Sequence, residues 1–155
     1  MTGWRFARLD DLTAREVHDI LQARSAVFVV EQACVFQDMD GADPQGWHLF
    51  ARTGGALAAY CRLLPGGVKF ADPSSGRVIT PQAVRGSGMG RALMEEALRR
   101  SSALWPGAAV RISAQLRLEK FYLSLGFVTD SEPYDEDGIP HVEMVRRPRG
   151  EAASV

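Results

Sequence analysis

Hydrophobic and polar residues repeat with two different periods along the chain, and each period predicts one kind of element. Seven short segments alternate apolar with polar residues or form a brief apolar run, which is typical of strands. They cover residues 4–9, 47–51, 56–64, 77–80, 108–114, 127–128 and 139–145. Three longer segments repeat apolar residues every three to four positions, as amphipathic helices do; they cover residues 14–30, 88–104 and 118–125. This order predicts an α/β fold with helices packed around one central sheet.

Local signals mark the ends of the predicted helices. Thr13 precedes the first helix, and Glu16 three residues later completes a capping-box pattern. Gly126 closes the third helix. The second helix has an apolar face formed by Met89, Leu93, Met94, Ala97, Leu98 and Leu104. Its solvent face is expected to consist of Glu95, Glu96, Arg99 and Arg100. Residues 68–76 show neither period and predict an irregular connection.

The length of 155 residues fits a single domain. We place this domain at residues 1–147 and expect a flexible tail at residues 148–155. The net charge of −1 argues against a general nucleic-acid-binding protein. No segment has the roughly 20 consecutive apolar residues of a membrane span, and the N-terminus is unlike a secretory signal. We therefore expect a cytoplasmic protein without membrane or nucleic-acid partners.

The cysteines and histidines give no sign of a disulfide framework or a metal site. Cys34 and Cys61 form no CxxC pair, which favours a reducing compartment. Neither cysteine has a histidine beside it in the sequence, so we expect buried, unreactive thiols. The histidines at positions 18, 48 and 141 lack the spacing of metal ligands, so no metal is expected. Arginine greatly outnumbers lysine, which favours a bacterial source.

One segment runs from a short strand through a glycine-rich turn into a helix. Its sequence is Val78-Ile79-Thr80-Pro81-Gln82-Ala83-Val84-Arg85-Gly86-Ser87-Gly88-Met89-Gly90-Arg91. The first amides of a helix have no partner within the helix, and its dipole adds positive charge there, so this turn predicts a phosphate-binding site. Glycines allow the backbone to approach a ligand, while Arg85 and Arg91 supply charged donors. A glycine turn without a ligand is the alternative.

The spacing of the glycines decides between the known phosphate-binding motifs. A P-loop needs a lysine that this turn lacks, and the GxGxxG pattern fails because Arg91 or Leu93 occupies its last position. The turn instead resembles the Arg-x-x-Gly-x-Gly signature of the GCN5-related N-acetyltransferases (GNATs). About 30 residues later, Phe121-Tyr122-Leu123-Ser124-Leu125-Gly126-Phe127 resembles their second signature, a helix end of the form FYxxxGF.

Further stretches resemble the ElaA-type subgroup of GNATs, so the resemblance spans residues 4–146. The shared stretches are residues 27–32, 38–43, 62–65, 76–78 and 132–142. Pro81 departs from the subgroup, where serine is common, although proline is frequent there among GNATs at large.

The resemblance implies the GNAT fold, in which a mixed and mostly antiparallel sheet is flanked by helices and splayed between its two central parallel strands. It also implies that acetyl-CoA is the co-substrate and that its acetyl group passes directly to a primary amine in a ternary complex. Backbone amides near Ile79 and Thr80 would polarise the thioester carbonyl. The cofactor-binding residues carried over are Val78, Ile79, Thr80, Arg85, Gly86, Ser87, Gly88, Met89, Gly90, Arg91, Ala114 and Tyr122.

The resemblance also assigns catalytic roles. Tyr122 is the candidate general acid that protonates the departing thiolate; its alternative is an ordinary core tyrosine. His141 and Glu31 are candidates for the general base, with a water relay as a third route. Two acidic loops would favour a cationic amine if both line one cleft, and would otherwise be solvated loops. They contain Asp38, Asp40, Asp43, Glu132, Asp135, Glu136 and Asp137.

Three functions remain open at this point. The first is N-acetyltransfer to a small-molecule or peptide amine. The second is a non-catalytic acyl-CoA-binding module that keeps the glycine turn. The third is a nucleotide-binding domain of another fold, against which the missing P-loop lysine and the failed GxGxxG spacing both count. GNATs are often dimers, so the resemblance leaves a homodimer open.

Overall fold

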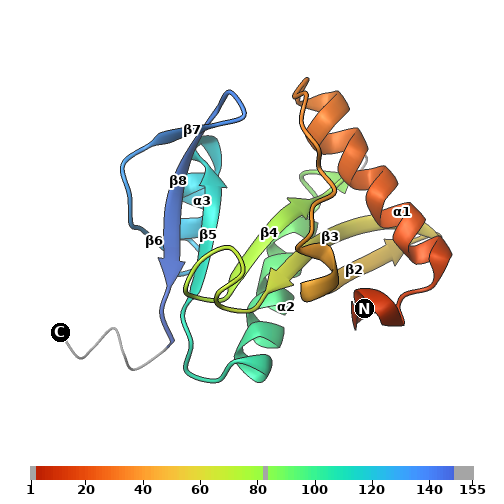
Figure 1. Cartoon of the computed structure of the whole chain (residues 1–155), viewed down its shortest axis with the longest axis horizontal. Helices are drawn as coiled ribbons and strands as arrows, with labels where there is room; N and C mark the ends of the chain where they lie inside the picture. Colours follow the sequence, from red (N-terminus) through yellow and green to blue (C-terminus); the bar gives the residue numbers. More distant parts are fainter. Residues whose placement is uncertain (1–2, 82–83, 149–155) are drawn as a thin grey trace.

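The computed structural model describes residues 3–81 and 84–148, which form one eight-stranded sheet with helices on both faces (Figure 1). The strands are β1 (Trp4–Arg8), β2 (Trp47–Thr53), β3 (Ala56–Leu64), β4 (Ser74–Ile79), β5 (Val110–Gln115), β6 (Val128–Thr129), β7 (Tyr134–Glu136) and β8 (Ile139–Arg146). Their order is β1-β2-β3-β4-β5-β8-β6, and β7 pairs with β8. Within this part of the chain, β4 and β5 are the one parallel pair. The predicted mixed, mostly antiparallel sheet is confirmed.

The helices begin where the sequence signals place them. Helix α1 (Ala14–Arg24) opens with the predicted capping box: Thr13 Oγ1 accepts from the Glu16 amide at 3.0 Å, and Glu16 Oε1 accepts from the Thr13 amide at 2.8 Å. The chain continues beyond α1 as a π-helical segment, Ser25–Glu31. The other helices are α2 (Met89–Leu104) and α3 (Glu119–Leu123). Short 3₁₀ turns are also present at Leu9–Asp11, Asp43–Gln45 and Leu116–Leu118.

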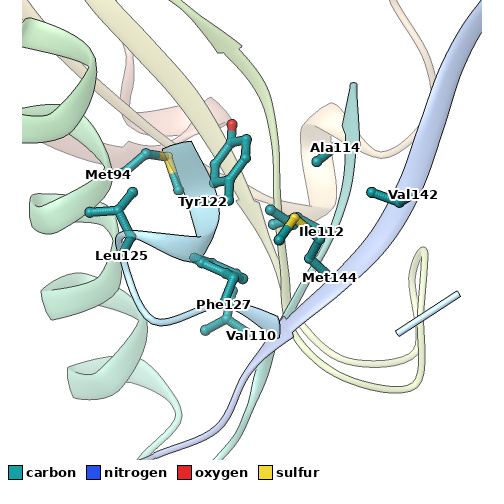
Figure 2. Packing of buried hydrophobic residues seen from close by; sticks show 9 residues of the cluster. All are labelled: Met94, Val110, Ile112, Ala114, Tyr122, Leu125, Phe127, Val142 and Met144. Atoms are coloured by element: carbon teal, nitrogen blue, oxygen red, sulfur yellow. The ribbon is translucent and has the colours of Figure 1, made fainter. Parts of the chain in front are cut away.

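The helices form two layers because alternate residues of each strand point to opposite faces of the sheet. On one face, Ile20 of α1 packs against Phe50, Tyr60 and Ile79 of the sheet. On the other face, α2 packs its predicted apolar stripe against β2 and β3. Helix α3 extends this second layer over β5 and β8, where Met94, Tyr122, Leu125 and Phe127 join the strand residues Val110, Ile112, Ala114, Val142 and Met144 (Figure 2).

Strands β4 and β5 separate almost as soon as they meet. They pair at a single register position, Ser74 with Arg111. Between Tyr60 and Arg62 the register of β4 on β3 shifts, and Arg77 adopts a positive φ of 50° there. Such a bulge bends the strand that carries the extra residue. The predicted splay between the two parallel strands is therefore confirmed, and it leaves β4 without a ladder partner on its β5 side beyond Ser74.

Two strand predictions need correction. Residues 74–76 were expected to be irregular, but β4 begins at Ser74 because Ser74 and Ser75 pair with Leu64 and Leu63 of β3. Their small polar side chains have little strand preference of their own, so tertiary pairing decides. Strand β7 lies inside the predicted acidic loop and forms a hairpin with β8. The hairpin turns at Asp137 and Gly138, whose φ values of 53° and 81° suit the Asp-Gly turn signal in the sequence.

Glu96 does not face solvent as expected from the helical pattern. It is 9% exposed. Arg99 Nη2 donates to Glu96 Oε1 at 2.6 Å and Arg100 Nε donates to Glu96 Oε2 at 2.7 Å. The two arginines, three and four residues further along α2, cover the carboxylate while satisfying it. Burial by itself raises the pKa of Glu96, but these hydrogen bonds outweigh it and the pKa lies below its usual value.

The first acidic loop is tied into a charge network at the end of α1. Arg24 is 0% exposed and donates to Asp38 at 2.9 Å and to Asp43 at 2.8 Å. Arg62 of β3 donates to Asp40 at 2.7 Å and to Asp43 at 2.8 Å. All three aspartates are therefore engaged by arginines, and Asp38 and Asp43 are also buried, which corrects the interpretation of this loop as an acidic rim. Buried ionised groups persist only when paired in this way.

Candidate active site

The separation of β4 and β5 opens a cleft of about 370 Å³ that passes through the sheet. The two strands form its sides, and the start of α2 together with α3 lines it on one face of the sheet. On the other face it is lined by the π-helical segment and the β7–β8 hairpin. The predicted site residues that line it are Glu31, Val78, Ile79, Thr80, Arg85, Gly90, Ala114, Tyr122 and His141. Residues from seven parts of the sequence thus meet at one place.

The first turn of α2 has the properties of an anion site. Gly88 is its N-cap with a φ of +85°, and no side chain caps the helix. Gly86 has a φ of +83°, and a Cβ added at either glycine would meet no atom within 4 Å. The turn therefore has open space around both glycines at the uncapped start of a helix, which is the kind of place where proteins bind anions. Ser87 donates to the Val84 carbonyl, while Met89 begins the helix itself.

The two arginines of the motif lie on different sides of this turn. Arg91 Nη2 donates to Ser124 Oγ at 2.6 Å, and its guanidinium lies 5.6 Å from the centre of the Phe121 ring. Arg85 instead holds Glu31: its Nη1 lies 2.9 Å from Glu31 Oε2 and its Nη2 donates to Glu31 Oε1 at 3.0 Å. This bidentate pair links the glycine turn to the π-helical segment.

Tyr122 lies at the boundary between the core and the cleft. It is 5% exposed, and its ring packs edge-on against Phe121 and Phe127. Its hydroxyl group is directed away from Phe127 (Figure 2) and makes no hydrogen bond to any residue that the structure describes. Burial raises the pKa of the phenol above its usual value. The group is therefore held in the protonated form, which is the form that a general acid needs.

His141 of β8 is paired with Glu136 of β7, a residue that the sequence placed only in an acidic loop. His141 Nδ1 lies 2.7 Å from the Ile139 carbonyl oxygen, and Nε2 lies 3.3 Å from Glu136 Oε2. Both partners are acceptors, so a neutral ring donates to one of them and its other nitrogen can take up a proton. Glu136 also accepts from Ser113 at 3.4 Å. Pairing across the β7–β8 hairpin could not be read from the loop composition.

The strand residues of the motif line the gap between β4 and β5. Val78 and Ile79 lie along the edge of β4 that has no partner, Thr80 follows directly after the strand, and Ala114 lies on β5. A strand edge without a neighbour presents backbone donors and acceptors. Both cysteines are buried. Desolvation raises the pKa of the Cys61 thiol to about 12, which fits the expected unreactive thiol.

Comparison with known proteins identifies the class that this fold and cleft define. Residues 10–148 match the family described as acetyltransferase (GNAT) domain, and the chain belongs to this acyltransferase family. It is 39% identical to the protein ElaA of Escherichia coli K12 over 94% of this chain and 97% of ElaA. It is 41% identical to a UPF0039 protein of Synechocystis, over 94% of this chain and 95% of that relative. The resemblance to ElaA-type GNATs is confirmed.

Solved structures agree with these relatives. An acyl-CoA N-acyltransferase from Pseudomonas aeruginosa superimposes with a TM-score of 0.89 at 42% identity, covering 94% of this chain and 99% of that one. The crystal structure of Escherichia coli ElaA superimposes with a TM-score of 0.89 at 38% identity, covering 95% and 100%. The GNAT fold is therefore confirmed.

Two absences hold for residues 3–81 and 84–148. None of their helices is long and apolar enough to span a membrane. They contain no group of three or more His, Cys, Asp or Glu side chains arranged to hold a metal ion.

Proposed function

We propose that this protein transfers an acetyl group from acetyl-CoA to a primary amine, by direct attack of the amine in a ternary complex. The observation that carries the proposal is the cleft itself. Two parallel strands that pair once and then diverge expose their inner edges beside an uncapped helix start. The GNAT domain match and the acyl-CoA N-acyltransferase relative support a CoA-linked donor. The family description supports acetyl as the acyl group.

The residues of the cleft have distinct roles in this proposal. The amides of Gly86 to Arg91 bind the pyrophosphate, and the edge of β4 near Ile79 donates to the carbonyl oxygen on which charge develops. The bound donor supplies an activated thioester carbonyl. Tyr122 donates a proton toward the sulfur as the carbon–sulfur bond breaks. Ala114 and Val78 exclude water from the sides of the slot.

The structure favours one of the two candidate bases. The Glu31 carboxylate is already engaged by two nitrogens of Arg85, so it is a poor acceptor for the proton of an ammonium group. The His141–Glu136 pair lines the cleft on the side of the β7–β8 hairpin, which we call the acceptor half because the amine is proposed to bind there. When His141 takes up a proton, the Glu136 carboxylate balances its charge. We assign uptake of the amine's proton to this pair.

Replacing Gly88 with Trp is expected to abolish acetyl-CoA binding. The indole would occupy the open space over the first turn of α2, where the pyrophosphate is proposed to lie. Isothermal titration calorimetry with acetyl-CoA measures the result directly. We expect binding by the wild type and at least a 100-fold loss of affinity in the variant, since the phosphate contacts are lost together.

Gly107→Trp is the matched control for this substitution. Gly107 also has a positive φ, 78°, and open space at its Cβ, but it follows the other end of α2. Both variants carry similar backbone strain, of the order of 1–2 kcal/mol, so their melting temperatures should fall by similar amounts. Loss of acetyl-CoA affinity in both variants, or no binding by the wild type, would contradict the proposed site.

A further inference from the structure

Lys69 is a cation of the cleft lining without an ion-pair partner among the described residues. Lys69 lies in the connection before β4 and lines the cleft. Its ammonium lies 5.5 Å from the centre of the Phe70 ring but makes no ion pair with any residue in the described parts of the chain. Lys69 is exposed to solvent. Neighbouring protein atoms nevertheless desolvate it and lower its pKa.

The other cations near Lys69 are neutralised. Arg77 Nε lies 2.8 Å from Asp38 Oδ1. Arg62 is paired with Asp40 and Asp43. Together with Arg24, three arginines face the three aspartates of the first acidic loop, so this network carries no surplus charge. Lys69 therefore contributes a net positive charge to the lining of the cleft.

The same cleft also carries negative groups. Glu136 and Asp137 of the β7–β8 hairpin line it, and Glu136 contributes an attractive charge at Lys69. Other lining residues are apolar and include Val27, Phe28 and Phe36. The cleft lining thus contains both a proton-accepting pair and an unpaired ammonium. A complementary ligand has an amine at one end and an anionic group at the other.

We propose that the acceptor is a small primary amine that also carries a carboxylate, and that Lys69 binds this carboxylate. The inference rests on the proposed acyl transfer and specifies its acceptor. The amine enters the slot between β4 and β5, and its nitrogen attacks the thioester carbon. The ammonium group first gives one proton to the His141–Glu136 pair, so that the attacking nitrogen is a neutral amine. As the amide forms, the carbon–sulfur bond breaks and the thiolate takes a proton from Tyr122. The second proton released by the nitrogen restores the Tyr122 hydroxyl. Diamines and polyamines are disfavoured because their second cation would meet Lys69.

Matched acceptors test the proposal. Each pair shares a carbon chain and differs in a carboxylate or methyl end: glycine with ethylamine, β-alanine with propylamine, and 4-aminobutyrate with butylamine. 1,4-Diaminobutane places a second cation at the far end, and triglycine offers a peptide carboxylate. We expect kcat/KM to be about tenfold higher for at least one carboxylate member than for its partner, as one charge-assisted contact allows. Preference for triglycine over glycine would identify a peptide source of the same chemistry.

Substitution of Lys69 connects the preference to this residue. In Lys69→Gln the carboxylate preference should disappear through an increase in KM with kcat nearly unchanged, and in Lys69→Glu the diamine should become the better acceptor. Lys120, on the exposed surface of α3, is the only other lysine in the chain, so Lys120→Gln is the matched control. It should keep the wild-type preference.

A binding measurement separates this inference from the proposed function. Calorimetric titration of 4-aminobutyrate and butylamine into the protein saturated with coenzyme A requires no turnover. Tighter binding of 4-aminobutyrate, lost in Lys69→Gln, supports the acceptor site even if no amine is acetylated, an outcome that would refute only the transfer activity. Equal binding or equal kcat/KM within every matched pair, or an unchanged preference in Lys69→Gln, would overturn the role of Lys69.

Discussion

Tyr122→Phe is expected to lower kcat for amine acetylation by about 100-fold or more while acetyl-CoA affinity stays within a factor of two. The substitution removes one hydroxyl group that makes no hydrogen bond within the described chain, so the core cluster around Met94 and Phe127 keeps its packing. General acid catalysis typically contributes 10²–10⁴-fold. Steady-state kinetics with the best acceptor of the matched panel give kcat, and calorimetry gives the affinity for acetyl-CoA.

The same variant distinguishes the enzyme from a binding module. A core tyrosine without a catalytic role would leave kcat within a factor of two, and that result would remove Tyr122 from the mechanism. Unchanged melting temperature is the control for folding. If the wild type binds acetyl-CoA yet acetylates no amine of the panel, the non-catalytic acyl-CoA-binding module becomes the better description.

Asp43→Asn should cost about 3–5 kcal/mol of the free energy of unfolding, which is the cost of breaking a buried ion pair from one side. Asp43 is 5% exposed and accepts hydrogen bonds from both Arg24 and Arg62. The neutral amide leaves Arg24, which is fully buried, with half of its carboxylate partners. Urea unfolding followed by circular dichroism measures the loss.

Asp19→Asn is the control for this substitution. Asp19 pairs with Arg52 at 3.0 Å on the surface, where ion pairs contribute little to stability. Its loss should be small beside that of Asp43→Asn. Equal losses in the two variants would show that the buried network adds no more than a surface pair.

The same network predicts how stability depends on pH. Burial by itself raises the pKa of Asp43, but hydrogen bonds from Arg24 and Arg62 outweigh it and lower the pKa below its ordinary value. The pKa of Asp40 is also lowered, because its hydrogen bond from Arg62 and the nearby positive charges outweigh burial. A carboxyl whose pKa is lower when folded stabilises the protein at pH values above its unfolded pKa, which is about 3.9. This contribution is lost as pH falls through the folded value. Wild type should therefore lose stability below about pH 4 more steeply than Asp43→Asn.

Features encoded by neighbouring residues could be predicted from the sequence, and features made by distant ones could not. The capping box of Thr13 and Glu16 and the glycine turn of residues 86–90 each lie within a few positions, so the local pattern predicts them. The pairing of His141 with Glu136 needs the β7–β8 hairpin. The neutralisation of the first acidic loop needs Arg24, which the helical pattern alone would leave at the surface.

The same limit applies to the acceptor site. Lys69 belongs to a connection without a hydrophobic period, so nothing in the sequence separates it from any other loop lysine. Its position becomes informative only once the nearby Arg62 and Arg77 are seen to be paired and Lys69 is not. Charge balance over a folded surface depends on which side chains meet, which local sequence does not specify.

The sheet has two halves, β1–β4 and β5–β8, which are joined by the single register pair between β4 and β5. Ser74 and Arg111 form this pair, and the Arg111 side chain strengthens the junction by pairing with Asp72 and Asp130. Beyond this pair no backbone ladder joins the two halves along β4 and β5, so a molecule bound between them takes the place of the missing strand-to-strand bonds. Filling the slot and stiffening the sheet would then be one event, and under the proposed function the two substrates together would complete a sheet that the polypeptide leaves open.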